Sequence, residues 1–282
     1  MMKNILLLFV LLVLLQLNIK SQTIEGKVVD QQTNKALPYV NLGVVELGIG
    51  TVSDKEGVFT LEIPKGQADS VLFSAVGYSS RKVAVSDLLE IRKVWLSPRS
   101  YKLQSFDVIE KGVGRDKTYG IKRGFPAGRT NLASNEPGDE IGVPIKINRP
   151  TFLKSAHFTI ERVSGDSMIY RINIYDFKDG VVGRNLVKEN ILFEGAQKKG
   201  VVSVDLTPYE LLVSDDVLLT LENIEVDDEE LASGMGFRYK AVFLRNRSIY
   251  GRIGETSKNV GGKFSKLLEG SALNFFFVGR KL

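Results

Sequence analysis

The chain contains one histidine, His157, and no cysteine. A catalytic zinc site built from histidine and carboxylate ligands needs at least two histidines, with an open position left for water. This chain cannot assemble that ligand set, so its composition argues against a zinc peptidase. An exported chain without cysteine also forms no disulfides and has to rely on its hydrophobic cores.

His157 could still belong to a Ser-His-Asp arrangement. It lies in the stretch SAHFTIE, where Ala156, Phe158 and Ile160 alternate with polar residues. This alternation predicts that His157 shares the outer face of a strand with Ser155. Catalytic groups usually lie on loops or strand ends, and the chain has no G-x-S-x-G motif. A surface histidine is therefore the favoured interpretation, and no catalytic residue is assigned.

Carboxylates occur in two clusters of the C-terminal half, at residues 215–216 and 227–230. Calcium takes six to eight oxygen ligands, so loops of this kind in an exported sandwich could hold it. No D-x-D-x-D-G loop is present, which favours solvated turns. Calcium stays open as an alternative, and we assign no metal ligand and no cofactor. Gly112 and Gly114 follow no Rossmann strand and precede no helix, so they indicate no nucleotide.

A glycan-binding surface needs aromatic side chains on one sheet face or at a loop rim. Tyr175 and Phe177 share one strand parity, with Asp176 and Asp179 beside them. These four residues are the candidate ligand platform. Aromatic residues at such positions are more often core residues, and Trp95, the only tryptophan, fits the last strand of the first domain.

These residues have to be positioned by β-structure, because the chain reads as short strands separated by turns. In residues 22–97 the clearest expected strands are 24–29, 39–45, 58–63, 71–73, 82–85 and 94–96. About seven short strands with a turn every 8–12 residues are typical of an antiparallel sandwich. No long segment with a 3.6-residue period interrupts them. The sequence therefore predicts an N-terminal seven-stranded β-sandwich.

The remaining chain is expected to hold an extended linker and a second all-β domain. Residues 98–140 become rich in Gly, Pro, Asn and basic residues, with few apolar positions, and are expected to form the linker. From residue 141 to 282, longer β patterns predict a second sandwich or jelly roll of about eight strands. The short loop at 164–167 predicts a hairpin between strands at 152–163 and 168–177.

The N-terminus predicts export. Lys3 precedes an apolar run of eleven residues, 5–15, followed by a polar stretch that ends at Ser21. A bilayer span needs roughly 20 apolar residues, so residues 1–21 are expected to form a cleaved signal peptide, with an uncleaved anchor as the alternative. No later stretch is long enough to span a membrane. The formal net charge of +5 is not concentrated in a basic tract, which argues against nucleic-acid binding.

Four motifs of the first domain occur together and in order: IEGKVVD at 24–30, ALPYVNL at 36–42, GTVSDKEGVF at 50–59 and DSVLFSAVGY at 69–78. Together they resemble the carboxypeptidase regulatory-like domain, a transthyretin-like sandwich common in envelope proteins of Bacteroidetes. Residues 101–114 also resemble the segment that follows this domain in TonB-dependent receptors. The resemblance implies an accessory domain without catalytic residues. Its motif residues specify turns and core positions, such as the turn at 54–57.

The sequence is compatible with two functions. The first is an exported, non-catalytic structural or protein-interaction module in the periplasm or at the outer membrane, with an envelope protein or outer-membrane complex as its partner. The alternative is a carbohydrate- or ligand-binding accessory protein that uses loops of the second domain, with or without Ca²⁺. An enzyme is not expected, because no nucleophile–base pair or metal set can be nominated.

Overall fold

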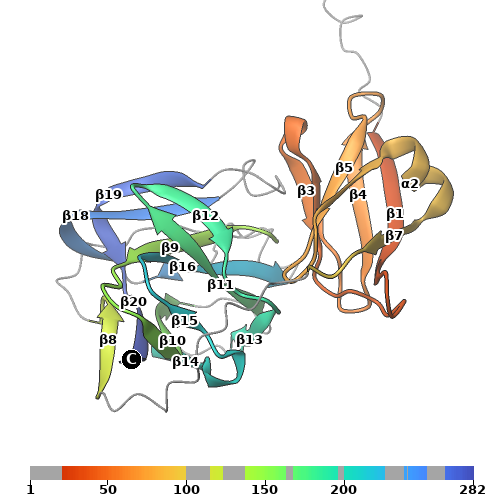
Figure 1. Ribbon diagram of the computed structural model, residues 1–282. Coiled ribbons are helices and arrows are strands. Elements are labelled where there is room, and N and C mark those ends of the chain that lie inside the picture. Colours follow the sequence, from red (N-terminus) through yellow and green to blue (C-terminus); the bar gives the residue numbers. More distant parts are fainter. Residues whose placement is uncertain are drawn as a thin grey trace, which may run out of the picture.

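The computed structural model describes residues 21–99, 115–122, 137–162, 168–195, 200–225, 238–239, 241–252 and 264–282. They form two β domains that lie side by side (Figure 1). Within these residues, no helix is both long enough and apolar enough to cross a bilayer. Residues 1–20 of the predicted signal peptide lie outside the described residues.

Within residues 21–99, seven strands build the first domain as two sheets. The strands are β1 (Ser21–Asp30), β2 (Asn41–Val44), β3 (Ile49–Val52), β4 (Val58–Pro64), β5 (Ser70–Ser74), β6 (Arg81–Ala84) and β7 (Lys93–Leu96). One sheet has the order β4-β1-β7 and the other β3-β2-β5-β6. The strand β1 runs antiparallel to β4 and parallel to β7. The predicted seven-stranded sandwich is confirmed.

The alternation along β4 explains why the two sheets pack together. Phe59, Leu61 and Ile63 are buried, whereas the residues between them are exposed. Phe59 meets Phe73 of the opposite sheet edge to face, with ring centroids 5.3 Å apart. Each such side chain contributes about 1.5–3 kcal/mol when it is fully removed from water.

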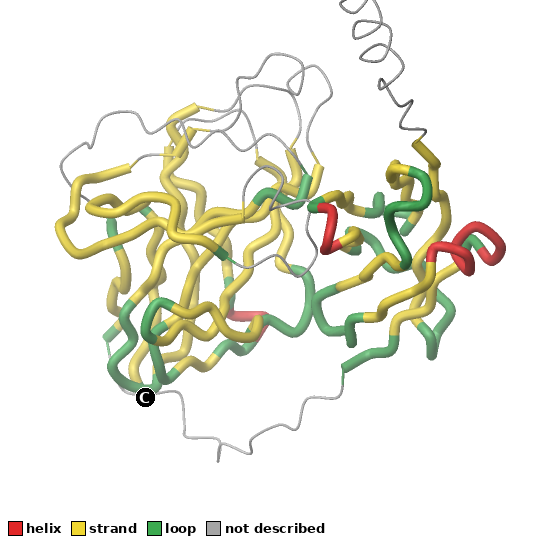
Figure 2. The backbone as a smooth tube through the Cα atoms, turned by 90° about the horizontal axis from the view of Figure 1, so that it is seen from above, coloured by secondary structure: helices red, strands yellow, loops and turns green. Residues whose placement is uncertain are grey.

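A short helix, α2 (Val85–Ile91), follows β6 where the sequence predicted a strand through residue 85. Val85 and Leu88 lie one turn apart and are the buried residues of this helix, which explains its apolar face. Figures 1 and 2 both place α2 on the side of the first domain that faces away from the second. A single 3-10 turn, η1 (Val45–Leu47), separates β2 from β3.

The second domain is a larger sandwich, with thirteen strands among the described residues. They are β8 (Asp116–Gly120), β9 (Glu140–Ile145), β10 (Thr151–Arg162), β11 (Met168–Lys178), β12 (Val181–Asn185), β13 (Ile191–Gly195), β14 (Gly200–Asp205), β15 (Leu212–Val213), β16 (Val217–Glu225), β17 (Arg238–Tyr239), β18 (Ala241–Arg252), β19 (Ser265–Leu273) and β20 (Phe275–Lys281). A 3-10 turn, η2 (Thr207–Tyr209), precedes β15.

These thirteen strands form one sheet of six and one sheet of seven. The six-stranded sheet has the order β14-β10-β20-β8, with β15 and β17 also paired to β10. The seven-stranded sheet has the order β12-β11-β16-β9-β18-β19, with β13 also paired to β11. The expected number of about eight was too low, in part because β15 and β17 have two residues each, too few to show an alternation, and in part because β8 lies in the predicted linker. The predicted all-β class is confirmed.

The predicted hairpin between β10 and β11 is wrong, because the two strands belong to opposite sheets. Phe158 of β10 and Tyr170 of β11 are both buried in the core that the sheets enclose. The Phe193 ring of the seven-stranded sheet stacks on both of them. A hairpin and a connection that crosses between sheets bury the same alternate residues, so the alternation could not separate them.

The predicted linker at 98–140 is wrong for residues 115–122, which belong to the second domain. Here β8 pairs with β20 as an edge strand, and Ile121 is buried in the second core. Ile121 also donates its backbone N–H to the Phe275 carbonyl at 3.0 Å. Backbone hydrogen bonds to β20 hold β8 at the edge of the sheet. Because β8 has no apolar alternation, its sequence did not predict a strand. Residues 100–114 and 123–136 lie outside the described residues.

Candidate interdomain site

Four buried charged residues form a row across neighbouring strands of the seven-stranded sheet. The register pairs Arg171 of β11 with Glu222 of β16, Glu222 with Glu140 of β9, and Glu140 with Arg252 of β18. Directly paired residues point to the same face of a sheet, so the order of the row is Arg–Glu–Glu–Arg. The exposed fractions are 2% for Arg171, 1% for Glu222 and 0% for Glu140, and the Arg252 side chain is 12% exposed.

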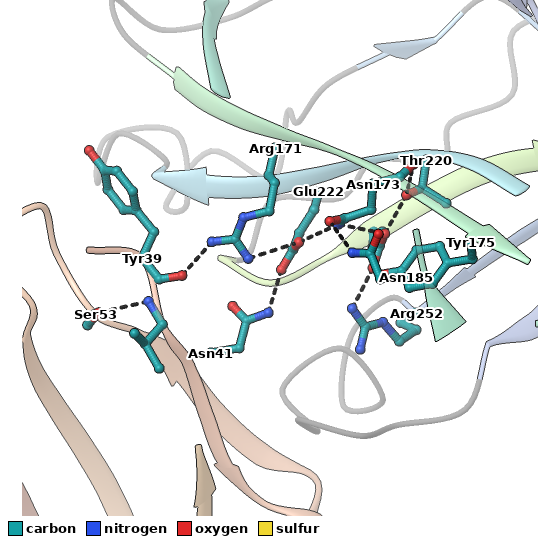
Figure 3. A network of polar contacts seen from close by, with 12 residues as sticks. Tyr39, Asn41, Ser53, Arg171, Asn173, Tyr175, Asn185, Thr220, Glu222 and Arg252 are labelled. Atoms are coloured by element: carbon teal, nitrogen blue, oxygen red, sulfur yellow. Dashed lines mark hydrogen bonds and ion pairs between the residues drawn. The ribbon is translucent and has the colours of Figure 1, made fainter. Parts of the chain in front are cut away.

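Neutral side chains separate the two carboxylates at the centre of this charge row. Two like charges placed directly opposite each other destabilise a sheet. The Asn173 amide relieves this repulsion by donating to Glu140 Oε1 at 3.0 Å and to Glu222 Oε2 at 2.8 Å. The hydroxyls of Thr220 and Tyr175 also donate to Glu140. Figure 3 shows Asn173, Thr220 and Tyr175 gathered in one network with Glu222.

The arginines at the two ends of the charge row neutralise the carboxylates. Arg171 Nη1 lies 3.3 Å from Glu222 Oε2, and Arg252 Nη2 donates to Glu140 Oε2. The Arg252 guanidinium also lies over the Phe264 ring, 5.0 Å from its centroid. Burial opposes the charge of Arg252, but the nearby Glu140 holds the pKa of the guanidinium above its usual range. Burial and the charge of Glu140 together raise the pKa of Tyr175 well above its usual value, so this phenol stays a neutral donor.

The first domain binds directly to the charge row. Asn41 Nδ2 donates to Glu222 Oε1 at 2.8 Å, and Arg171 Nη2 donates to the Tyr39 carbonyl. That carbonyl is presented by a turn in which Tyr39 has a φ of +57°. The turn is held by Ser53 Oγ, which accepts the Val40 N–H at 2.8 Å. The first domain thus contacts the Arg171–Glu222 end of the charge row, which helps to explain why these two residues are buried.

A second contact between the domains lies at the loop after β5. Val76 packs against the core of the second domain. Gly77 follows with a φ of +83°, and a Cβ atom placed there would lie 2.3 Å from the Lys188 carbonyl oxygen. The next residue, Tyr78, donates its hydroxyl to Asp30 at 2.8 Å within the first domain. This loop can therefore approach the second domain only because residue 77 has no side chain.

A cavity of about 230 Å³ lies between the domains, beside the charge row. Its wall includes Asn41, Tyr78 and Arg99 from the first domain and Arg171, Tyr175 and Arg252 from the second. Three buried polar atoms of this wall have no hydrogen-bond partner among the described residues: Arg171 Nε, Arg252 Nε and Asn41 Oδ1. The wall therefore combines hydrogen-bond donors and acceptors with apolar surface, a composition suited to binding a molecule that has both polar and apolar parts.

Comparison with known proteins identifies the first domain. Residues 24–106 match the family model of the CarboxypepD_reg-like domain. The first domain is a carboxypeptidase regulatory-like domain. Domains of this family are non-catalytic, in agreement with the motif residues, which serve turns and the core. Two of those motifs also supply the contacts of the regulatory-like domain with the second domain, through Asn41 and Gly77.

A comparison with curated proteins found no match. Among solved structures, the chain is similar to a clostridial cysteine protease, Cwp84, after propeptide cleavage, with a TM-score of 0.43, 10% identity, and 83% of this chain and 51% of that chain covered. It is also similar to the cysteine protease and lectin-like domains of Cwp84, a surface-layer-associated protein of Clostridium difficile. That match has a TM-score of 0.39 and 9% identity, and covers 92% of this chain and 58% of that chain. The chain thus spans little more than half the length of either structure.

The four residues of the predicted ligand platform are only partly brought together. Tyr175 donates to Glu140 and lines the interdomain cavity. Phe177 packs edge to face on Tyr250, with centroids 5.1 Å apart. Asp176 pairs with exposed Arg184 at 3.0 Å, and Asp179 lies in the following turn with a φ of +51°. Tyr175 and Phe177 alternate with Asp176 along β11, so the aspartate points to the other face. The platform stays a prediction, and only its Tyr175 lies at the cavity.

His157 lies on the outer face of the six-stranded sheet. Its ring stacks on Phe276 at 4.4 Å, and its two nitrogens lie 2.8 Å from the hydroxyls of Ser155 and Ser203. Partial burial and the positive charge of Lys122 lower the pKa of the imidazole. Among the described residues, no carboxylate hydrogen-bonds this ring. Within the described part of the chain, His157 thus lies between two serine hydroxyls as a neutral imidazole, without the carboxylate partner that a Ser-His-Asp triad needs.

The candidate calcium ligands are placed only in part. Asp216 Oδ1 accepts the Ile147 N–H at 2.9 Å and so stabilises a turn. Over the described ranges, no three His, Cys, Asp or Glu side chains gather closely enough to hold a metal ion. The acidic stretch at 227–230 lies outside those ranges.

Sequence reasoning missed every member of the charge row. Arg171 and Asn173 alternate with the buried Tyr170, Ile172 and Ile174, which is the pattern of a strand with one solvated face. The only signal in the sequence was β16, where Val217, Leu218 and Leu219 are consecutive and all buried. A strand that is apolar on both faces indicates that something covers the sheet.

Proposed function

We propose that this chain is exported to the cell envelope and acts there as a non-catalytic structural and protein-interaction module. The observation that supports this most directly is the charge row that joins the regulatory-like domain to the second sandwich. Burying ions is a costly way to stabilise a protein, but it selects one geometry strongly. The two domains therefore present a composite surface of defined shape to a partner.

Export is supported by the N-terminal sequence, with Lys3 before the apolar run 5–15. A non-catalytic role is supported by the family of the regulatory-like domain and by the site itself. The four charged residues of the charge row are paired with one another, and the neighbouring phenol of Tyr175 is held neutral. An envelope protein or an outer-membrane complex is the partner we propose.

Fractionation of cells that produce the full chain with a C-terminal tag tests the export. Leu282 is partly exposed, so a tag there should leave the fold intact. We expect the tagged protein in the envelope fraction, with its N-terminus at Gln22. A variant that lacks residues 1–20 should stay in the cytoplasm. Recovery of the full-length chain from the cytosol, with Met1 retained, would refute the proposal.

Cross-linking of intact cells followed by mass spectrometry tests the interaction. A partner of the composite surface should form cross-links to lysines of both domains. The variant Arg171→Met, which cuts the direct bond to Tyr39, should reduce those cross-links, whereas Arg184→Met should not. If an isolated regulatory-like domain captured the same partner equally well, the composite surface would be ruled out.

A further inference from the structure

The cavity between the two domains has the features of a binding site for a small molecule. Its volume of about 230 Å³ is too large for a single water molecule and lies below the roughly 300–1,000 Å³ typical of sites for drug-sized ligands. The cavity is therefore large enough for a molecule of about one ring. Val76 and Val187 supply apolar surface to the wall, and the remaining wall is mostly polar.

The charges of the wall favour an anion. Three arginines line the cavity, Arg99, Arg171 and Arg252, but Glu222 is the only lining carboxylate among the described residues. Glu140 lies directly behind Arg252 and neutralises it. No described carboxylate pairs with Arg99, so one positive charge is left over. A ligand with a single negative charge would balance the site, and an arginine can bind a carboxylate through two parallel hydrogen bonds.

The unpartnered atoms add a second requirement. Arg171 Nε and Arg252 Nε are donors, Asn41 Oδ1 is an acceptor, and all three are buried without a partner among the described residues. A buried polar group without a hydrogen-bond partner destabilises the protein, and a ligand that supplies the missing partner removes that penalty. Hydroxyl groups satisfy both kinds of atom, because each one donates and accepts. Figure 3 shows Asn41 and Arg252 at separate places along the network.

We propose that the interdomain cavity binds a small carboxylate that also carries hydroxyl groups, namely a uronate, either free or at the end of an acidic glycan. The carboxylate pairs with Arg99 at the open side of the cavity. The hydroxyls meet the side chains of Asn41, Arg171 and Arg252 near the charge row, and the apolar face of the sugar ring packs on Val76 and Val187. Glu222 disfavours a second negative charge. Because both domains supply the wall, the ligand also strengthens their association.

Calorimetric titration and thermal unfolding of the purified chain without residues 1–21 test this proposal, with sodium glucuronate as the probe. We expect saturable binding tighter than about 1 mM and a rise in Tm. Glucose, which lacks the charge, and glucosamine, which reverses it, should bind at least tenfold more weakly. Inorganic phosphate should also be weaker, because it does not satisfy the acceptor and the donors together.

Two matched variants locate the site. Arg99 is exposed, so Arg99→Gln should fold normally and weaken glucuronate binding at least tenfold. Arg149→Gln removes the same charge at an exposed position outside the cavity and should leave binding unchanged. A glucuronate-terminated disaccharide distinguishes the sources: binding as tight as that of the monosaccharide indicates a glycan end, and its exclusion indicates the free acid.

The proposal is overturned by any of three results. A dissociation constant for glucuronate weaker than about 1 mM would show that the cavity is not a binding site for this class of ligand. Equal affinity for glucose or phosphate would show that the carboxylate and hydroxyls are not recognised together. Binding unchanged in Arg99→Gln would place the ligand elsewhere.

Discussion

Arg171 connects the two domains through both nitrogens at the end of its guanidinium group. One nitrogen contacts Glu222 within the second domain, and the other donates to the Tyr39 carbonyl of the regulatory-like domain. The planar group holds these two bonds in a fixed relation, which a lysine could not do. Without it, Glu222 would keep its burial and its charge but lose its cationic partner.

Replacing Arg171 should therefore destabilise the protein strongly. We expect Arg171→Met to lower the free energy of unfolding by about 3–5 kcal/mol, because it leaves a buried carboxylate uncompensated. Urea denaturation measures the change. Arg184→Met is the control: it removes an ion pair whose two side chains are 76% and 46% exposed, and should cost less than about 1 kcal/mol. Equal losses in the two variants would show that the charge row contributes little.

Asp30 makes the stability of the regulatory-like domain depend on pH. Its Oδ1 accepts the backbone N–H groups of Gln32 and Thr33, each at 2.7 Å, and its Oδ2 accepts the Tyr78 hydroxyl. The hydrogen bond from the Thr33 backbone, followed by that from Tyr78, holds the pKa of Asp30 below its ordinary value of 3.8. Burial of the phenol, together with its hydrogen bond to Asp30, raises the pKa of Tyr78 to about 12.

A depressed carboxylate pKa stabilises the fold above the pKa of the unfolded chain, and the effect is lost as the pH falls through the pKa of the folded state. We therefore expect Asp30→Asn to be less stable than the wild type at pH 7. The difference should shrink as the pH falls below about 4. Urea denaturation at a series of pH values measures it. A difference that stays constant down to pH 2 would contradict the assigned role of Asp30.

At the scale of elements, the loop after β5 decides how closely the domains approach. The left-handed backbone at Gly77 and the proximity of the Lys188 carbonyl both exclude a side chain. Gly66 has a similar φ of +73°, but no atom lies within 4 Å of the position its Cβ would occupy. The two glycines therefore separate the cost of the backbone conformation from the cost of the domain contact.

Alanine at each of these positions tests that separation. Gly66→Ala should cost roughly 1–2 kcal/mol, the penalty for a left-handed alanine. Gly77→Ala should cost about 1–3 kcal/mol more, because the new methyl group meets a backbone carbonyl that cannot turn away. Thermal unfolding gives the stabilities, and small-angle scattering shows whether the domains separate. Equal penalties would mean that the loop does not set the domain contact.

At the scale of the whole molecule, the charge row and the Gly77 loop join two cores that would otherwise be independent. Each domain has its own cluster of buried apolar residues. The contacts between the clusters include Val76, which belongs to the regulatory-like domain but packs on the second core. Domains coupled in this way tend to lose their structure together.

Scanning calorimetry should therefore show a single transition for the chain without residues 1–21. The double variant Arg171→Met/Asn41→Ala removes both hydrogen bonds described above between the regulatory-like domain and the charge row, and two transitions should appear. Arg184→Met should keep the single transition. Two separated transitions in the wild type would show that the domains are not coupled.

The sequence by itself determined the β class, the regulatory-like domain and its core. Alternating strands such as β4 bury every second residue, and this local pattern does not depend on what the rest of the chain does. The sequence could not place β10 and β11 in opposite sheets, because the alternation along a strand does not show which other strand it pairs with. It also missed β8, whose position depends on backbone hydrogen bonds to β20.

Only the tertiary structure decided the site. Arg171, Glu222, Glu140 and Arg252 lie on four strands that come together through the sheet order, and each looks like a solvated residue in its own segment. The regulatory-like domain contacts Arg171 and Glu222 at one end of the row, and Phe264 of the second domain lies against Arg252 at the other. A polar residue facing water and one facing another domain produce the same alternation, so the pattern in one strand cannot distinguish them. The contact between the domains supplies that information and makes a row of charges into a candidate site.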